Sequence, residues 1–443
     1  MSRLKKQEMI TAINSMIQVN DTISKSSNLN YDAVFSALSQ CQDVAISIGN
    51  NIELRFPDKS DVISLLEGYC EDLYQLNMNM ADVNQRAKTC KRINKALLNI
   101  LNRIKYEIPE DKKEIVFLPY KVSMWDSFES LWKKLKDDDN SDVFVVPIPY
   151  YDKKEDGTFG EMHYEGDKYP SNVPVVSYEE YDIAKRHPDV IYIHNPYDNH
   201  NKVTSVHPDY YAKKLRNETD KLIYIPYFVA INGNVDRNFC TTPGVFYSHE
   251  VIVQSERTKE IYIEELRKYE SDNNCLGIFG DLDSKIIAGG SPKFDKVRES
   301  KLEDFKIPES WNKLILNDDG AKKKVVLYNT TIASMLLDTP KMLDKMEDVF
   351  RIFKNNSDII LLWRPHPTLR STIKSMRKDC YDRYVEMEER FIKDGYGIYD
   401  DTPDMYMAIT LSDAYYGDWS SLVELYRCTG KPIMIQNTDV MGD

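Results

Sequence analysis

Apolar residues recur every three or four positions through the first hundred residues, which is the period of an amphipathic helix. The clearest case is a heptad seam with a polar residue in its middle, formed by Val83, Ala87, Cys90, Asn94, Leu97, Leu101 and Ile104. An asparagine at a core position of such a seam usually fixes register or oligomeric state at some cost in stability. We therefore expect residues 1–108 to form a helical bundle for docking or self-association.

The pattern changes after a polar linker at residues 108–113. From there on, short runs rich in β-branched residues alternate with helical segments, as in chains that build parallel sheets with crossover helices. We expect an α/β fold with two Rossmann-like domains, at residues 114–284 and 285–443, preceded by the all-α domain. The predicted strands are Ile115–Leu118, Val143–Val146, Val190–Ile193, Leu222–Ile225 and Val251–Val253 in the first domain, and Lys324–Leu327, Ile359–Leu362, Tyr396–Ile398, Ala414–Tyr416 and Ile433–Ile435 in the second.

Composition narrows the class of protein. Lys and Arg number 58 against 71 Asp and Glu, and the net charge of −13 argues against nucleic acid as a partner. There is no apolar run of about 18 residues, and the polar amino terminus does not resemble a signal peptide. The seven cysteines are scattered without a Cys-x-x-Cys pair, which argues against a disulfide framework and a zinc site. We expect a cytoplasmic protein without a metal.

The stretch Ile359–Pro367 carries the first candidate for chemistry. Its apolar run predicts a strand buried on both faces, and two prolines then hold His366 on a stiff loop at the strand's carboxyl end. In open parallel sheets ligands bind at that edge. Arg364 adds a planar fork of donors suited to phosphate. For His366 taken alone, the alternative is a structural role, in which the histidine lies in the turn that ends the strand and makes its hydrogen bonds within the protein.

Two more stretches of the second domain have a pattern suited to a nucleotide. Gly290-Ser-Pro-Lys-Phe-Asp295 lies at the entry to the domain. In the second stretch a strand ends at Tyr416, a Gly and Asp418 make the turn, and Ser420 and Ser421 open a helix. Backbone N–H groups and hydroxyls at such a helix start can bind a diphosphate. The alternative is that Asp418 or Ser420 is simply the residue that caps the helix.

Together these motifs resemble the CDP-glycerol glycerophosphotransferase family of teichoic-acid polymerases and primases. That family carries Gly-x-Pro-Arg-x-Asp, Arg-x-His-Pro and Thr-Asp-Tyr-Ser-Ser, and this chain has the counterparts in the same order, within residues 285–436. The resemblance implies that the two Rossmann-like domains have the GT-B arrangement. It also implies transfer of an alditol phosphate, most often glycerol phosphate, from a CDP-activated donor to a hydroxyl of a cell-surface glycan or teichoic-acid-like acceptor, with release of CMP.

The resemblance implies roles for single residues as well. His366 would lie near the donor diphosphate, and Ser420 and Ser421 would hold its phosphates. The departing CMP would be stabilised by Arg364, Lys293, a protonated His366 and the helix terminus after Asp418. No cofactor is required besides the CDP-linked donor. A lipid-linked polyol-phosphate acceptor would place the protein at the inner face of the cell membrane, and residues 1–108 could hold it in a homo-oligomer.

The first domain departs from the family pattern. The family has a second histidine in a Trp-His-Gly stretch, thought to act as base toward the acceptor, and this chain has none. His194, which follows a predicted strand, is our candidate replacement. An equal alternative is that His194 is a structural residue at the strand end, bonded to a neighbour. His207 is a second candidate for the base. A metal site at His194, Asp198, His200 and His207 is the least favoured interpretation because their spacing is irregular. The acceptor-side candidates are Ser123, Trp125, Asp126 and, in a lid or acceptor loop at residues 159–167, His163.

A second departure is Glu424, where the polymerase family generally lacks an acid. Nucleotide-sugar glycosyltransferases and UDP-N-acetylglucosamine 2-epimerases have a comparable glutamate, whose carboxylate can bind the two ribose hydroxyls. A sugar transferase or epimerase of GT-B type is therefore the alternative function, and a non-catalytic scaffold is the second alternative. The chain ends at Asp443 without the C-terminal helix usual in GT-B proteins, so we expect the N-terminal bundle to supply part of that bracing or the sequence to lack the helix.

Overall fold

The computed structural model describes residues 3–26, 30–317 and 320–440. Contacts between residues divide the chain into two compact units. A helical unit comprises Met1–Ile115 with Asp139–Asp142, and an α/β unit comprises Val116–Asp138 with Val143–Asp443. The division therefore falls just after the polar linker that the sequence predicts at residues 108–113.

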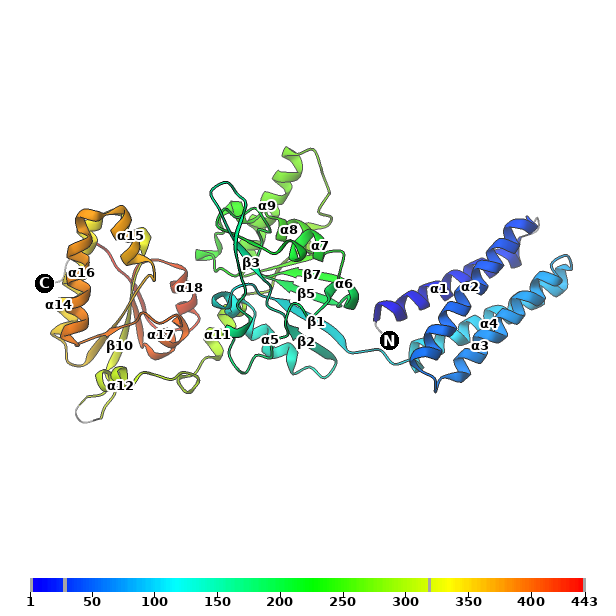
Figure 1. The fold of residues 1–443 in the computed structure, drawn as a ribbon, viewed down its shortest axis with the longest axis horizontal. Coiled ribbons are helices and arrows are strands. Elements are labelled where there is room, and N and C mark those ends of the chain that lie inside the picture. Colours follow the sequence, from blue (N-terminus) through cyan, green and yellow to red (C-terminus); the bar gives the residue numbers. More distant parts are fainter. Residues whose placement is uncertain (1–2, 27–29, 318–319, 441–443) are drawn as a thin grey trace. The chain divides into compact units, whose positions relative to one another are not determined.

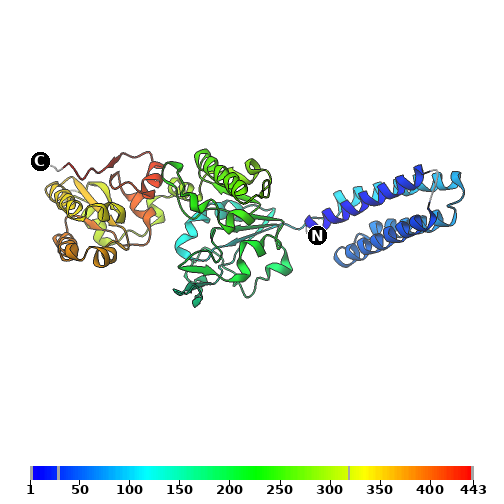
Figure 2. The ribbon, with the colours of Figure 1, turned by 90° about the horizontal axis from the view of Figure 1, so that it is seen from above.

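Four long helices make up the helical unit and run alongside one another (Figure 1 and Figure 2). Asn30 and Asp82 cap the second and the fourth helix, because their side-chain oxygens accept backbone N–H groups of the first turn. The helices are α1 (Arg3–Lys25), α2 (Tyr31–Arg55), α3 (Ser60–Met78) and α4 (Val83–Glu107).

The predicted heptad seam of α4 lies inside this unit. Its apolar members from Cys90 onward are buried, whereas Val83 at the start of the helix is exposed. The Nδ2 of Asn94 donates to Oδ1 of Asp21 (2.6 Å), and its Oδ1 accepts from Nδ2 of Asn20 (2.7 Å). Both partners lie on α1. The polar position thus fixes how α4 pairs with α1 within one chain, and self-association through residues 1–108 stays a prediction.

The first sheet of the α/β fold has six strands in the order β2-β1-β5-β7-β8-β9. Strands β5, β7, β8 and β9 pair in parallel. Because β9 follows residue 284, this sheet extends past the predicted domain boundary. The strands are β1 (Lys113–Leu118), β2 (Ser141–Val145), β5 (Val190–Ile193), β7 (Lys221–Tyr224), β8 (Glu250–Val253) and β9 (Ile286–Ala288).

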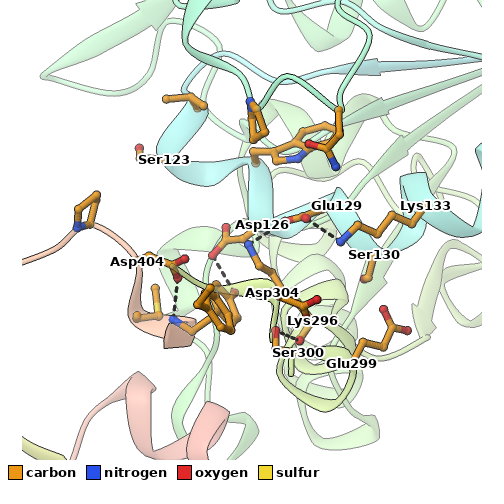
Figure 3. A pocket seen from close by; sticks show the side chains of 18 residues that line it. Ser123, Asp126, Glu129, Ser130, Lys133, Lys296, Glu299, Ser300, Asp304 and Asp404 are labelled. Carbon is orange, nitrogen blue, oxygen red and sulfur yellow. Dashed lines mark hydrogen bonds and ion pairs between the residues drawn. The ribbon is translucent and has the colours of Figure 1, made fainter. Parts of the chain in front are cut away.

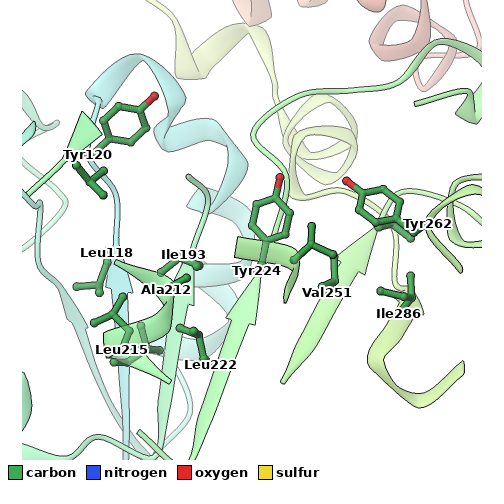
Figure 4. Packing of buried hydrophobic residues seen from close by; sticks show 14 of the residues in the cluster. Leu118, Tyr120, Ile193, Ala212, Leu215, Leu222, Tyr224, Val251, Tyr262 and Ile286 are labelled. Carbon is green, nitrogen blue, oxygen red and sulfur yellow. The ribbon is translucent and has the colours of Figure 1, made fainter. Parts of the chain in front are cut away.

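Helical segments connect these strands, as a parallel sheet requires. Figure 4 shows apolar side chains of neighbouring strands packed side by side, among them Leu118, Ile193, Leu222 and Val251. The segments are η1 (Val122–Ser127), α5 (Glu129–Lys136), η2 (Gly166–Lys168), α6 (Ile183–Arg186), η3 (Pro208–Tyr210), α7 (Ala212–Leu215), η4 (Ile231–Gly233), η5 (Arg237–Phe239), α8 (Pro243–Tyr247), α9 (Glu256–Asp272) and α10 (Leu282–Lys285).

A small antiparallel sheet, which the sequence pattern did not predict, lies within the same part of the chain. Its strands are β3 (Tyr150–Lys153), β4 (Phe159–His163) and β6 (Thr204–Val206), in the order β4-β3-β6. The segment predicted as a lid or acceptor loop at residues 159–167 therefore begins as an edge strand. The three strands are short and rich in polar residues, so hydrophobic alternation gives no signal for them.

The second sheet is wholly parallel, with the order β12-β11-β10-β13-β14. Ile360 and Leu362 of β11 pack into one hydrophobic cluster, whereas Leu361 and Trp363 pack into another. Burial on both faces explains why this strand is apolar throughout. The strands are β10 (Lys324–Thr330), β11 (Ile359–Pro365), β12 (Ile398–Tyr399), β13 (Ala414–Gly417) and β14 (Ile433–Ile435).

The prediction of two Rossmann-like parallel sheets preceded by an all-α region is thus confirmed. No helix within the described ranges combines the length and the apolar character needed to cross a lipid bilayer. The helices from residue 292 onward are α11 (Pro292–Glu299), η6 (Leu302–Asp304), α12 (Glu309–Ile315), α13 (Ile332–Leu337), α14 (Thr339–Lys354), α15 (Leu369–Met376), α16 (Lys378–Asp394), α17 (Met405–Leu411) and α18 (Ser421–Arg427).

Candidate active site

Two of the three sequence motifs meet at the carboxyl edge of the second sheet. Thr330 of β10 lies opposite Pro365 of β11, and Asn329 lies opposite Gly417 of β13. The loops that follow these three strands therefore start side by side. The backbone N–H of His366 donates to the carbonyl oxygen of Thr330 (2.9 Å) and so joins the loop after β11 to the end of β10.

The side chain of His366 is exposed at this edge. Its Nδ1 lies 3.3 Å from the backbone nitrogen of Thr368, which can only donate, so the ring proton sits on Nε2. Partial burial lowers the pKa of His366 below its usual value, which favours the neutral ring. The geometry thus offers a neutral N–H donor, where the resemblance implied a protonated ring.

Arg364 is buried, and its guanidinium already has partners. Nη1 lies 2.5 Å from Oδ2 of Asp400, and Nη2 donates to the carbonyl oxygen of Thr402 (2.8 Å). Both partners belong to the loop that follows β12. The structure therefore places Arg364 as a brace for that loop, and a direct contact with the donor stays a prediction.

Asp418 holds the start of the loop after β10. Its Oδ2 accepts the backbone N–H of Thr331 (2.6 Å) and the hydroxyl of the same residue (3.0 Å), and its Oδ1 accepts from Nε2 of Gln436. Asp418 is 3 % exposed, so this carboxylate is committed to the protein. Gly417 is required just before it, because φ is +148° and an added Cβ would lie 2.4 Å from the carbonyl oxygen of Asn329.

The two serines differ in their surroundings. Ser420 is the N-cap of α18, where its Oγ accepts the backbone N–H of Leu422 (3.3 Å) and lies 3.2 Å from Nδ2 of Asn329. Ser421, the first residue of that helix, is exposed at the same edge. The capping alternative is therefore seen for Ser420, while Ser421 remains accessible to a ligand.

Glu424 is bonded to protein groups rather than open to a ribose. Its Oε1 accepts the backbone N–H of Asn232 (3.0 Å) and lies 3.1 Å from Nη1 of Arg427. The same Nη1 donates to Oδ1 of Asn232 (2.8 Å). The carboxylate thus links α18 to the η4 turn of the first sheet.

A cavity of about 880 Å³ lies within the α/β unit, and Figure 3 shows its lining. The loop after β1, the helices α5 and α11, the segment η6 and the start of α17 all contribute side chains. Ser123, Trp125 and Asp126 line it, so the structure brings three of the four acceptor-side candidates together. His163 does not line it; its Nε2 lies 2.7 Å from Oδ2 of Asp152 on the small sheet.

Asp126 makes two hydrogen bonds beside this cavity. Its Oδ2 accepts from Nζ of Lys293 (2.8 Å) and from the hydroxyl of Tyr406 (2.8 Å). Burial and the carboxylate raise the pKa of Tyr406, which keeps that hydroxyl a donor. Within the described residues, Oδ1 of Asp126 and Nε1 of Trp125 have no hydrogen-bond partner, although both side chains are buried. Beside the cavity the protein therefore buries one acceptor and one donor that have no protein partner.

An ion pair that the sequence did not reveal lies beside this group. Nζ of Lys296 is 2.7 Å from Oε2 of Glu129 and 4.3 Å from the centre of the Tyr406 ring. Burial alone would raise the pKa of Glu129, but Lys296 and Lys133 outweigh it and lower that pKa. The only sequence signal was the position of Lys296 one residue after Asp295 of the glycine motif.

His194, the candidate base, has both ring nitrogens bonded within the protein, and its role as a base stays a prediction. The residue is fully buried, its Nε2 accepts the backbone N–H of Tyr120 (3.2 Å), and its Nδ1 lies 2.9 Å from Oγ of Ser127. Burial, with a contribution from the charge of Lys293, lowers the pKa of His194 to about 3. Both nitrogens are used and the ring stacks on Phe128, so the strand-end alternative describes this residue. No cluster of three His, Cys, Asp or Glu side chains able to hold a metal occurs among the described residues.

Comparisons with known proteins give one family and several distant structural likenesses. Residues 268–442 match the family described as CDP-glycerol:poly(glycerophosphate) glycerophosphotransferase. No curated protein matches the chain significantly in sequence.

Among solved structures, a putative UDP-N-acetylglucosamine 2-epimerase from Listeria monocytogenes is 12 % identical, over 73 % of this chain and 79 % of that one, with a TM-score of 0.44. The wall teichoic acid polymerase TagF is 16 % identical, over 81 % and 80 %, with a TM-score of 0.39. Likenesses of this size assign neither a substrate nor an activity. The family match covers the second sheet and all three motifs, so the predicted resemblance to the CDP-glycerol glycerophosphotransferases is confirmed for residues 268–442.

Proposed function

We propose that this protein transfers an alditol phosphate, with glycerol phosphate the first candidate, from a CDP-activated donor to a hydroxyl of a glycan or polyol-phosphate acceptor. The observation that carries the proposal is the family match over residues 268–442, together with the position of two of the three motifs at one sheet edge. His366, Asp418 and Ser421 lie on loops that start side by side there. Ligands of open parallel sheets bind at that edge.

In the proposed reaction the acceptor hydroxyl attacks the β-phosphorus of the donor. A new P–O bond forms to the acceptor, the bond from the β-phosphorus to the oxygen of CMP breaks, and the hydroxyl proton passes to solvent. Phosphoryl transfer of this kind depends on alignment and on stabilisation of charge. The neutral Nε2–H of His366 donates toward the diphosphate, and the Ser421 hydroxyl binds a phosphate oxygen. Arg364 and Asp418 hold the loops from which these donors project. No cofactor is needed besides the donor.

We assign the acceptor to the cavity lined by Ser123, Trp125 and Asp126. A polyol carries hydroxyls that both donate and accept; the exposed Ser123 lines the cavity, and Nε1 of Trp125 and Oδ1 of Asp126 are buried beside it without protein partners. Lys133 and Lys296 also line the cavity, but both pair with Glu129, and carboxylates outnumber lysines in the lining, so the cavity suits the hydroxyls of a polyol better than its phosphate. A lipid-linked acceptor of this chemistry would bring the protein to the cytoplasmic face of the membrane and into cell-wall biosynthesis.

The test is a donor panel of CDP-glycerol, CDP-ribitol and UDP-N-acetylglucosamine, measured first by thermal shift. A donor present at 100 times its dissociation constant adds about 2.7 kcal/mol to the free energy of unfolding. We expect stabilisation by a CDP-alditol and, with a polyol-phosphate acceptor, release of CMP. Selective stabilisation by the UDP-sugar would favour the glycosyltransferase or epimerase alternative, against which the bonded state of Glu424 already argues. If none of the three donors bound, the non-catalytic scaffold would be the remaining interpretation.

A further inference from the structure

A second cavity, of about 500 Å³, lies at the amino edge of the first sheet. Ser248 and His249 come directly before β8, and Lys285 comes directly before β9; all three line it. The loop after β1, which lines the candidate active site, leaves the same sheet at the carboxyl ends of its strands. The two cavities therefore belong to opposite edges of one sheet.

The second cavity is positively charged. Lys213, Arg216 and Lys285 line it, and no carboxylate is among the lining residues within the described part of the chain. Lys285 is buried, and its Nζ donates to the carbonyl oxygens of Phe246 (3.3 Å) and Ser248. Burial lowers the pKa of Lys285 to about 8 and that of His249 below its usual value, and Arg216 lowers both further. These positive groups therefore repel one another, and no carboxylate among the lining groups offsets their charge.

One wall of this cavity is aromatic. The rings of Phe246 and Phe279 stack with their centres 5.1 Å apart, and Tyr269 lies 4.7 Å from Phe246. Ile278, beside Phe279, is 65 % exposed. In addition, Ser248 is fully buried at the cavity, and its hydroxyl has no partner among the described residues. A cavity lined by both cations and aromatic rings suits an amphiphilic anion.

We propose that this cavity binds a phosphate ester, with the phosphate held by Lys213, Arg216 and Lys285 and the organic group packed against Phe246 and Phe279. Arginine presents a fork that matches phosphate oxygens, and a desolvated lysine makes a strong charge-assisted bond. The ester is either a small soluble molecule or the headgroup of a phospholipid. The site is independent of the transfer reaction proposed above.

The experiment is calorimetric titration of the full chain with inorganic phosphate and with phenyl phosphate, in saturating CMP so that the donor site is occupied. We expect one site per chain, with phenyl phosphate bound more tightly than phosphate because of the aromatic wall. Arg216→Ala should weaken phenyl phosphate about tenfold, as expected for loss of a hydrogen bond to a charged group. Sedimentation with phosphatidylglycerol and phosphatidylcholine vesicles distinguishes a soluble ester from a phospholipid headgroup. If the site binds a headgroup, the wild-type chain sediments with the anionic vesicles and Arg216→Ala does not.

The neighbouring residue Lys214 supplies the matched control. Lys214 lies on α7, as Lys213 does, and carries the same charge. It pairs with Asp209 (2.7 Å) and does not line the cavity. Lys213 is exposed, so Lys213→Ala tests the site even where Arg216→Ala unfolds. We expect Lys213→Ala to weaken phenyl phosphate and Lys214→Ala to leave it unchanged. Equal losses in both variants, or no binding by the wild-type chain at millimolar phenyl phosphate, would overturn the proposal.

Discussion

At the scale of single residues, hydrogen bonds decide which of the polar groups near the sheet edges can meet a ligand. Nδ1 of His366 accepts the backbone N–H of Thr368, which leaves Nε2–H as the donor available to a ligand. Arg364 and Asp418, by contrast, are committed to neighbouring loops. A buried charged group without a partner is costly, and both of these charges have their partners within the protein. Direct contact with the donor therefore falls to His366 and Ser421 in our proposal.

His366→Ala tests the donor assignment. Loss of one preorganised donor to a developing charge typically costs about 10²–10³ in rate, so kcat should fall by that factor while the donor is bound with near-normal affinity. Because the lowered pKa of His366 favours the neutral ring, its contribution to kcat should not decline between about pH 6.5 and 8. Steady-state kinetics and donor titration measure both effects, with His187→Ala, at the carboxyl end of α6, as the histidine control. Unchanged turnover would make His366 a strand-end structural residue.

Trp125→Phe tests the acceptor assignment. The substitution keeps most of the ring packing against Phe128 and Trp132 and removes only the N–H that lacks a protein partner. Loss of one hydrogen bond of about 1 kcal/mol should raise the KM for the acceptor roughly fivefold and leave the KM for the donor unchanged. Initial rates with each substrate varied in turn give both constants. A rise in the donor KM instead would move the cavity to the donor side.

The buried His194 should make stability depend on pH. Its pKa is about 3 in the folded protein and about 6.5 when unfolded, so the unfolded chain binds the proton more readily below pH 6.5. The stabilising contribution is therefore complete above pH 6.5 and is lost as the pH falls toward 3. Between pH 7 and pH 5 the free energy of unfolding should drop about 2 kcal/mol more in the wild type than in His194→Gln. Urea unfolding at both values measures the difference, and His200→Gln, at an exposed site, should behave like the wild type.

At the scale of elements, helix α4 shows how a polar core position can serve a single chain. The seam residues from Cys90 to Ile104 are buried within the unit formed by α1–α4, and the amide of Asn94 bonds to Asn20 and Asp21 of α1. A wrong register between these two helices would leave three polar groups without partners. The asparagine thus specifies helix pairing inside the bundle.

Asn94→Leu measures this effect. Asn20 and Asp21 would each lose one hydrogen bond at a partly buried site, so the bundle should be destabilised by about 1–3 kcal/mol. Asn99→Leu, at an exposed position of the same helix, should change stability by less than about 0.5 kcal/mol. Thermal unfolding followed by circular dichroism gives both values. If Asn94→Leu also changed the oligomeric state in light scattering, the seam would take part in self-association after all.

At the scale of the whole molecule, the helical unit and the α/β unit have separate cores. The four helices bury their own hydrophobic cluster, and the two sheets bury three others. Within the α/β unit, Asp126 makes buried bonds to Lys293 and Tyr406, and Glu424 makes an exposed bond to Asn232, so polar contacts link the two sheets. Units with separate cores can fold alone.

Deleting residues 1–108 should therefore leave donor binding in place. None of the residues at the carboxyl edge of the second sheet belongs to the helical unit, so the dissociation constant of the CDP-linked donor should stay within about threefold of that of the full chain. Calorimetric titration of both forms gives the comparison, and light scattering shows whether the deletion lowers the oligomeric state. Loss of donor binding in a folded truncated protein would show that the helices contribute to the site.

The sequence by itself determined the α-helical start, the ten predicted strands and the edge of the sheet at which the motifs lie. Hydrophobic period and proline positions are local properties, so a strand such as Ile359–Leu362 is visible without its neighbours. The polar linker likewise marked where the helical unit ends. The short strands β3, β4, β6 and β9 gave no signal, because they are polar or too brief for alternation to be recognised.

Only the tertiary structure decided which polar side chains are free. His194 looks like a base after a strand, but the fold buries it against Phe128 and uses both of its nitrogens. Arg364 looks like a phosphate fork, yet Asp400, 36 residues later in the chain, lies 2.5 Å from it. Sequence pattern places a residue on an element, whereas its hydrogen bonds depend on segments that are distant in the chain. For the same reason the cavities lined by Asp126 and by Lys285 appear only when the elements are packed.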